Sequence, residues 1–255
     1  MNEVLERRFA VIGARVKVER VRGTPRIDVD VDRRGEFFAL RVPSDREAVI
    51  VVHADRDERC LLLLVRDGGE KSKFLCGFDE RHWFVAAIPE FARGVGGVVA
   101  AKDALQPDAV RDAVARVRPR DRFRRRNAAY VRQGEWFFLP QWSVEVDERA
   151  VLRDEPLTRG LGKAHVLEYA FRRGGETVFV NAAHPTGINA AEFELLPPAQ
   201  VRKGGWREMV RDPELYATGA VRHPDHNTIV LHGWHRVLMN TEHAARAMRH
   251  VAFID

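Results

Sequence analysis

The densest group of candidate metal ligands lies near the C-terminal end, between residues 223 and 235, where four of the ten histidines fall. Imidazole nitrogen and carboxylate oxygen are ligands that zinc prefers. If residues 228–239 form a strand, His232 and His235 point to opposite faces, and one ion can collect both only through a bulge at Gly233. We therefore predict a divalent-metal site, for instance for zinc, with a smaller set of ligands: His223, Asp225, His226 and His235.

Such a site would support a metal-dependent hydrolase, including a nuclease. His223 and Asp225 also match two ligands of a non-haem iron facial triad, whose third ligand would have to be His243 or His250. The structural alternative is that Asp225 and His226 satisfy backbone groups of the hairpin loop, while His235 is a buried, hydrogen-bonded core residue.

A second unusual feature is the concentration of positive charge in residues 111–132, which we call the arginine segment. It holds nine arginines and two acidic residues, a local charge of +7, whereas the whole chain carries +5. Arginine pairs with phosphates, and neighbouring aromatic rings can stack on bases. Two alternatives compete, namely pairing of these arginines with acids elsewhere in the fold and a solvated connector. We predict contact with RNA or DNA through Arg116, Arg118, Arg120, Arg122, Arg124, Arg125, Arg126 and Arg132.

Several isolated residues are weaker candidates. His165 and His184 lie near predicted strand ends, which can converge in space. The turn at residues 78–83 places two acids and a histidine together, an arrangement that general acid–base catalysis uses beside a pocket. Cys60 and Cys76 lie in apolar runs and are expected to be buried free thiols, with a catalytic Cys76 as the alternative.

The chain lacks the glycine-rich phosphate loop, the dinucleotide-binding glycine pattern, the G-x-S-x-G turn and the C-x-x-C motif. Their absence disfavours an ordinary nucleoside triphosphatase, a dinucleotide-binding dehydrogenase and a serine hydrolase. A scaffold or partner-binding protein without chemistry fits the same residues.

These candidates depend on a fold that we predict to be α+β, with two strand-rich halves of mainly antiparallel sheet joined by a short helical segment. Residues 1–106 form the N-terminal half, residues 107–127 the helix and arginine-rich connector, and residues 128–255 the C-terminal half, unless both halves share one continuous domain. Hydrophobic residues make up 45% and charged residues 31% of the 255 residues, enough apolar material for a sizeable core.

Alternation of apolar and polar residues predicts two hairpins, one of residues 26–32 with 36–42 and one of residues 215–221 with 228–239. Helical spacing predicts helices over 98–105 and 108–117. The remaining expectations are a strand at 142–146, a long irregular loop at 197–213 and a closing helix from Thr241 to His250.

No stretch approaches the roughly 20 apolar residues that a membrane span needs. The charged N-terminus also lacks the unbroken apolar region of a signal peptide. We therefore expect a cytoplasmic protein with no membrane partner, and the sequence leaves its oligomeric state open.

Overall fold

The class of the fold is α+β, as predicted, with more strands than helices. Among the described residues, every strand pair is antiparallel except the one between β1 (Val16–Val21) and β3 (Gly35–Pro43). No helix in this part of the chain is long and apolar enough to cross a membrane. The structure is a computed structural model that describes residues 2–43, 49–67, 69–159 and 163–246.

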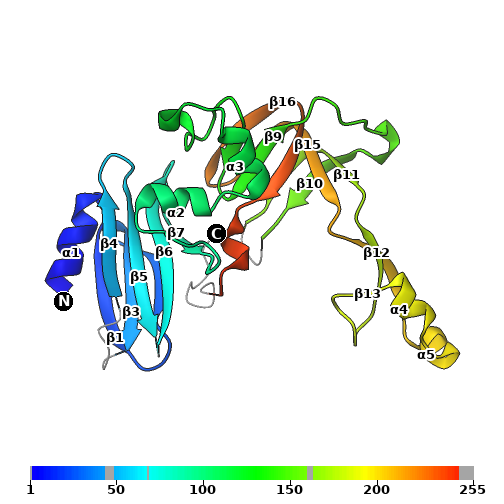
Figure 1. Cartoon of the computed structure of the whole chain (residues 1–255), viewed down its shortest axis with the longest axis horizontal. Helices are drawn as coiled ribbons and strands as arrows, with labels where there is room; N and C mark the ends of the chain where they lie inside the picture. The colour runs from blue at the N-terminus through cyan, green and yellow to red at the C-terminus, as the bar shows by residue number, and fades with distance from the viewer. Residues whose placement is uncertain (1, 44–48, 68, 160–162, 247–255) are drawn as a thin grey trace.

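The first seven strands form two sheets that pack face to face, which we call the N-terminal sandwich (Figure 1). Besides β1 and β3, the strands of the sandwich are β2 (Arg26–Asp32), β4 (Val49–Asp55), β5 (Cys60–Asp67), β6 (Glu70–Asp79) and β7 (His82–Ile88). One sheet has the order β1–β3–β2 and the other the order β4–β5–β6–β7. The first predicted hairpin is confirmed as β2 and β3. Phe38 from one sheet and Phe74 from the other are fully buried between them.

Two helices cover the sandwich. In α1 (Asn2–Val11), Leu5 and Phe9 share one face because of the helical repeat, and both are buried in the core between the sheets. In α2 (Val98–Ala104), Val98 is buried against the outer face of the β4–β7 sheet. β5 is therefore covered on both faces, which explains its continuous run of leucines.

A six-stranded sheet, the C-terminal sheet, forms most of the rest of the molecule (Figure 1). Its strands are β8 (Val131–Gln133), β9 (Trp136–Pro140), β10 (Leu152–Leu157), β11 (His165–Arg173), β15 (Glu214–His223) and β16 (His226–Met239). Their order is β10–β11–β15–β16–β9–β8, and β15 and β16 confirm the second predicted hairpin. α3 (Asp108–Val114) buries Val110 and Val114 against Tyr130 and Phe137 of this part of the chain.

Residues 174–213 project from the C-terminal sheet as a separate extension, which we call the arm (Figure 1). Its elements are β12 (Glu176–Val180), β13 (Ile188–Asn189), α4 (Ala190–Glu194), α5 (Pro198–Lys203) and β14 (Arg207–Arg211). The predicted irregular loop over 197–213 is wrong. Pro198 occupies the first turn of α5, a position that proline favours, and β14 pairs with β12.

Three other local expectations also differ from the structure. Residues 142–146 form no strand, whereas β10 forms without having been predicted. β10 contains Pro156, and a proline is tolerated there because β10 is the outermost strand and needs no hydrogen bonds on its free side. The closing segment begins with a short 3₁₀ helix, and residues 247–250 of the predicted helix lie outside the described residues. The 3₁₀ helices are η1 (Pro119–Asp121), η2 (Glu148–Ala150) and η3 (Thr241–Ala244).

The turn between β6 and β7 joins the sandwich to the C-terminal sheet. The carboxylate of Asp79 accepts hydrogen bonds from Arg125 Nε at 2.7 Å and from Arg132 Nη2 at 2.9 Å. Glu80 Oε2 accepts the backbone N–H of Asn227, in β16, at 3.0 Å. These contacts fix how the N-terminal sandwich meets the C-terminal sheet, and a cavity remains between the two.

Candidate functional site

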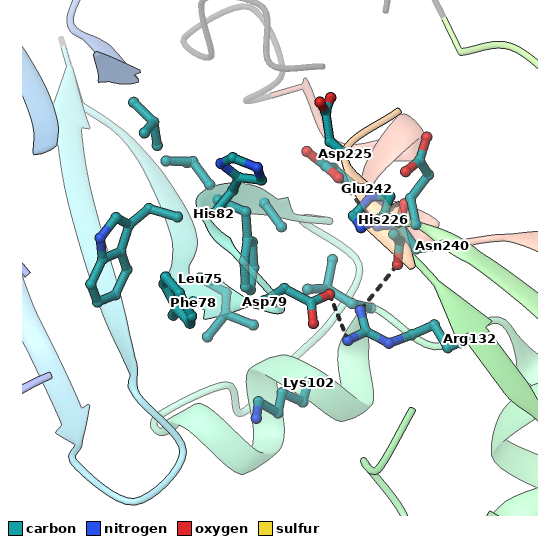
Figure 2. A pocket seen from close by; sticks show the side chains of 18 of the residues that line it. Leu75, Phe78, Asp79, His82, Lys102, Arg132, Asp225, His226, Asn240 and Glu242 are labelled. Atoms are coloured by element: carbon teal, nitrogen blue, oxygen red, sulfur yellow. Dashed lines mark hydrogen bonds and ion pairs between the residues drawn. The ribbon is translucent and has the colours of Figure 1, made fainter. Parts of the chain in front are cut away.

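A cavity of about 800 Å³, which we call the cleft, lies between the N-terminal sandwich and the C-terminal sheet. Leu75 and Phe78 line its sandwich side. His226, Asn240 and Glu242 line the opposite side, and Figure 2 shows them facing the apolar side chains across open space. A cavity of this volume is typical of sites for small molecules.

Three histidines from three adjacent strands come together beside this cleft, which His223 and His226 line, and we call them the histidine cluster. His165 is the first residue of β11, His223 is the last residue of β15, and His226 is the first residue of β16. Because these strands pair antiparallel, the start of one lies beside the end of the next. One nitrogen atom from each ring lies within 4.8 Å of the others, and two nitrogens on a tetrahedral zinc ion lie about 3.3 Å apart.

His165 is the most deeply buried member, with 2% of its surface exposed. Its Nε2 atom has no hydrogen-bond partner among the described residues. Burial, and then the neighbouring His223 and His226, lowers the pKa of His165 to about 3. The ring is therefore neutral at neutral pH, so one of its nitrogens carries the lone pair that a metal ion needs.

Gly134, in the turn between β8 and β9, provides the space that this cluster faces. Its φ angle is +56°, in the left-handed region that favours glycine. A Cβ atom at this position would lie 3.2 Å from His226 Nε2 and 3.5 Å from His165 Nε2. Two imidazole nitrogens therefore approach the same small space, and only the absence of a side chain keeps it open.

His223 already uses both ring nitrogens within the protein. Its Nδ1 atom accepts the backbone N–H of Asp225 at 3.2 Å, so its Nε2 carries the proton and donates to the carbonyl of Lys163 at 3.3 Å. Burial and the nearby His226 lower the pKa of His223. His223 therefore lies in the cluster, but it must turn away from Lys163 before it can bind a metal ion.

The other two predicted metal ligands do not join the cluster. Asp225 lines the cleft but forms an ion pair with Lys163 Nζ at 2.8 Å. His235 lies nine residues along β16 from His226, a distance of roughly 25–30 Å in an extended strand. It is buried on the sheet, and its Nδ1 lies 2.9 Å from the carbonyl of Gly233. The bulge at Gly233 does form, with a φ angle of +81°, but His232 stays exposed.

Two glutamates of the cleft were not among the predicted site residues. Glu135 follows Gly134, and burial raises the pKa of its carboxyl group. Glu242 is 5% exposed, and its Oε2 accepts from Arg159 at 3.0 Å and from Asn240 Nδ2 at 3.2 Å. Glu242 thus forms an ion pair, whereas Glu135 forms none with the described residues, a contrast that acid–base sites use.

Several arginines of the arginine segment are engaged inside the protein. Arg125 pairs with Asp79 and also with Glu80, and Arg132 pairs with Asp79. Burial alone would raise the pKa of Asp79, but Arg132 and Arg125 together hold it below its usual value. Arg122 donates to the backbone carbonyls of residues 115 and 117.

The other five predicted arginines are exposed: Arg116, Arg118, Arg120, Arg124 and Arg126. Asp121 lies between two of them, 3.1 Å from Arg124 and 3.6 Å from Arg120. In the part of the chain that the structure describes, no carboxylate lies within ion-pair distance of the remaining three. The positive charge of the arginine segment is therefore partly neutralised by ion pairs and partly exposed to solvent.

The isolated candidates have separate surroundings. His82 lines the cleft and its Nδ1 lies 2.6 Å from Glu36 Oε1. His184 belongs to the arm, where it stacks on Trp206. Cys60 and Cys76 are buried free thiols, and burial raises the pKa of both.

Comparisons of the chain with protein-family models, with curated proteins and with solved structures found no match.

Proposed function

We propose that this protein is a metal-dependent hydrolase whose divalent ion, such as zinc, is bound by the histidine cluster at the cleft. The observation that carries the proposal is the approach of His165 Nε2 and His226 Nε2 to the open space beside Gly134. The buried nitrogen of His165 without a partner supports it, since such an atom loses hydrogen bonds to water and gains none in return.

The surroundings suit the task of each ligand. His226 Nδ1 lies 3.5 Å from Glu80 Oε2 and has no hydrogen-bond partner among the described residues, so a small approach of Glu80 would let it orient this ring, as carboxylates do beside many zinc-bound histidines. His223 would supply the third nitrogen after turning away from Lys163. An ion held by these residues would make a bound water molecule lose a proton more easily than in bulk solvent.

The cleft also contains groups that can accept and return that proton. Glu135 and Glu242 line the same cavity as His223 and His226. A carboxylate that takes a proton from the attacking water and gives it to the leaving group completes hydrolysis without any change of oxidation state. The same proposal treats residues 1–106 and 128–255 as two domains with residues 107–127 between them, since clefts between domains commonly hold substrates.

Zinc titration of the purified protein tests this proposal. We expect one tightly bound ion per chain, with affinity at least about 100-fold weaker in His165→Asn and in His226→Asn because each loses one ligand. His235→Asn is the matched control, since it changes a buried histidine outside the cluster, and its affinity should stay within about threefold. Hydrolysis of activated esters or phosphate esters should disappear on chelation. Equal losses in all three variants, or no bound ion, would contradict the proposal.

Nucleic-acid association through the arginine segment is the second candidate function. The observation that favours it is the display of Arg116, Arg118 and Arg126 without carboxylate partners in the described part of the chain. Arginines in this state can exchange solvent counterions for phosphates without first breaking an ion pair.

Salt-dependent binding to a single-stranded RNA oligonucleotide measures this function. The affinity should fall steeply with added NaCl, and the Arg116→Ala/Arg118→Ala double variant should lower the log–log slope by about one to two. Arg122→Ala is a control, because Arg122 donates to backbone carbonyls inside the segment, and it should leave the slope unchanged. Binding that is insensitive to salt would exclude this candidate.

A further inference from the structure

The cleft has two chemically different walls. Apolar side chains of the sandwich, together with Leu105 directly after α2, form one wall, and Figure 2 shows Leu75 and Phe78 on this side. Phe78 packs edge-on against Trp83, with ring centroids 5.0 Å apart, so the aromatic surface is held in place. The opposite wall carries His223 and His226 of the histidine cluster and the two glutamates. A ligand that fills both parts must therefore combine an apolar group with a polar one.

Among the described residues, all four lysine and arginine side chains that line the cleft are already paired with carboxylates. Their partners are Glu58 for Lys102, Asp79 for Arg132, Glu242 for Arg159 and Asp225 for Lys163, all within 3.0 Å. A phosphate group would have to displace one of these carboxylates and leave it in the cavity without its cation. Such a displacement is unfavourable in a partly buried site.

The remaining ionisable groups of the cleft do not favour an anion either. Glu135 forms no ion pair with the described residues, and Glu36 faces His82. In the described part of the chain, five carboxyl groups line the cavity against four lysine and arginine side chains: Glu36, Asp79, Glu135, Asp225 and Glu242. Apart from the charge that a bound zinc ion would add, the described lining residues therefore offer a phosphate ester or a nucleic acid no surplus of cations. The exposed arginines of the arginine segment lie outside it.

We infer that the substrate of the cleft is a neutral carboxylic ester or amide that carries an apolar group. This inference rests on the proposed hydrolase for the bond that is broken. The apolar group lies against Phe78, and the carbonyl group faces the histidine cluster. The oxygen of water adds to the carbonyl carbon, the bond to the alcohol or amine breaks, one proton of water ends on the leaving group, and the carboxylic acid product keeps the other.

A series of substrates tests this inference with zinc-loaded protein. For 4-nitrophenyl acetate, butyrate and octanoate, kcat/KM should rise at least about tenfold from acetate to octanoate, because added methylene groups gain apolar contact. For 4-nitrophenyl phosphate and bis(4-nitrophenyl) phosphate it should be at least about 100-fold lower than for octanoate. Phe78→Ala should remove most of the chain-length preference. Phe91→Ala should keep it, since Phe91 is 61% exposed and does not line the cleft.

Binding of the neutral dye N-phenyl-1-naphthylamine to metal-free protein separates this inference from the proposed hydrolase. We expect one bound dye per chain, displaced by methyl octanoate and weakened at least about fivefold in Phe78→Ala but not in Phe91→Ala. Hydrolysis of phosphate esters in preference to carboxylic esters would overturn the inference while the hydrolase stands. Dye binding without any hydrolysis would overturn the hydrolase and support the ligand class. Absence of dye binding would overturn the ligand class.

Discussion

The substitution Gly134→Ala should weaken zinc binding at least about 100-fold. The new Cβ atom would lie 3.2 Å from His226 Nε2 and 3.5 Å from His165 Nε2. Zinc–nitrogen bonds are about 2.0–2.1 Å long, so an ion between these nitrogens and the new methyl group would compete for the same volume. Isothermal titration with zinc measures the loss directly.

Gly174→Ala provides a control for the backbone strain that any side chain causes at a positive φ angle. Gly174 has a φ angle of +66°, close to that of Gly134, but a Cβ there would meet nothing within 4 Å. Both variants should lose about 1 kcal/mol of unfolding free energy. Only Gly134→Ala should lose the ion. Unchanged zinc affinity in Gly134→Ala would place the ion elsewhere and remove the main support for the proposed site.

The local elements of this fold were mostly predictable, because they depend on short-range periodicity. Strict alternation in residues 26–32 predicted β2, and helical spacing over 98–105 predicted α2. The errors arose where a tertiary position decides the outcome. β10 tolerates Pro156 only because it lies at a sheet edge, and nothing within residues 152–157 shows that position.

The candidate site was only partly predictable, for a related reason. His223 and His226 are close in sequence, and a hairpin brings them together. His165 comes from β11 and meets them only through the pairing of β11 with β15. Gly134 comes from the turn between β8 and β9, which form the opposite edge of the sheet from β10 and β11. His235 was grouped with His223 and His226 because it is close to them in sequence. In an extended strand, however, the distance between two residues grows by about 3.3 Å for each residue that separates them. Sequence spacing is therefore a poor guide to ligand sets on long strands.

The substitution Asp79→Ala should lower the free energy of unfolding by about 2–3 kcal/mol. Its carboxylate is the shared acceptor of Arg125 and Arg132, and its side chain is only 16% exposed. Removing it leaves two guanidinium groups partly buried with less negative charge beside them, although Arg125 keeps its contact with Glu80. Breaking a fully buried ion pair costs about 3–5 kcal/mol, and partial exposure of the two arginines reduces that figure. Urea unfolding at neutral pH measures the difference.

Glu176→Ala is the matched control, since it removes an exposed ion pair with Arg211 in the arm. It should cost less than about 1 kcal/mol. The loss of unfolding free energy in Asp79→Asn should lie between those of Asp79→Ala and Glu176→Ala, because the amide oxygen can still accept one hydrogen bond but carries no charge. If Asp79→Ala were no more costly than Glu176→Ala, the β6–β7 turn would not hold the sandwich against the C-terminal sheet. The cleft between them would then lack the rigid frame that a catalytic site needs.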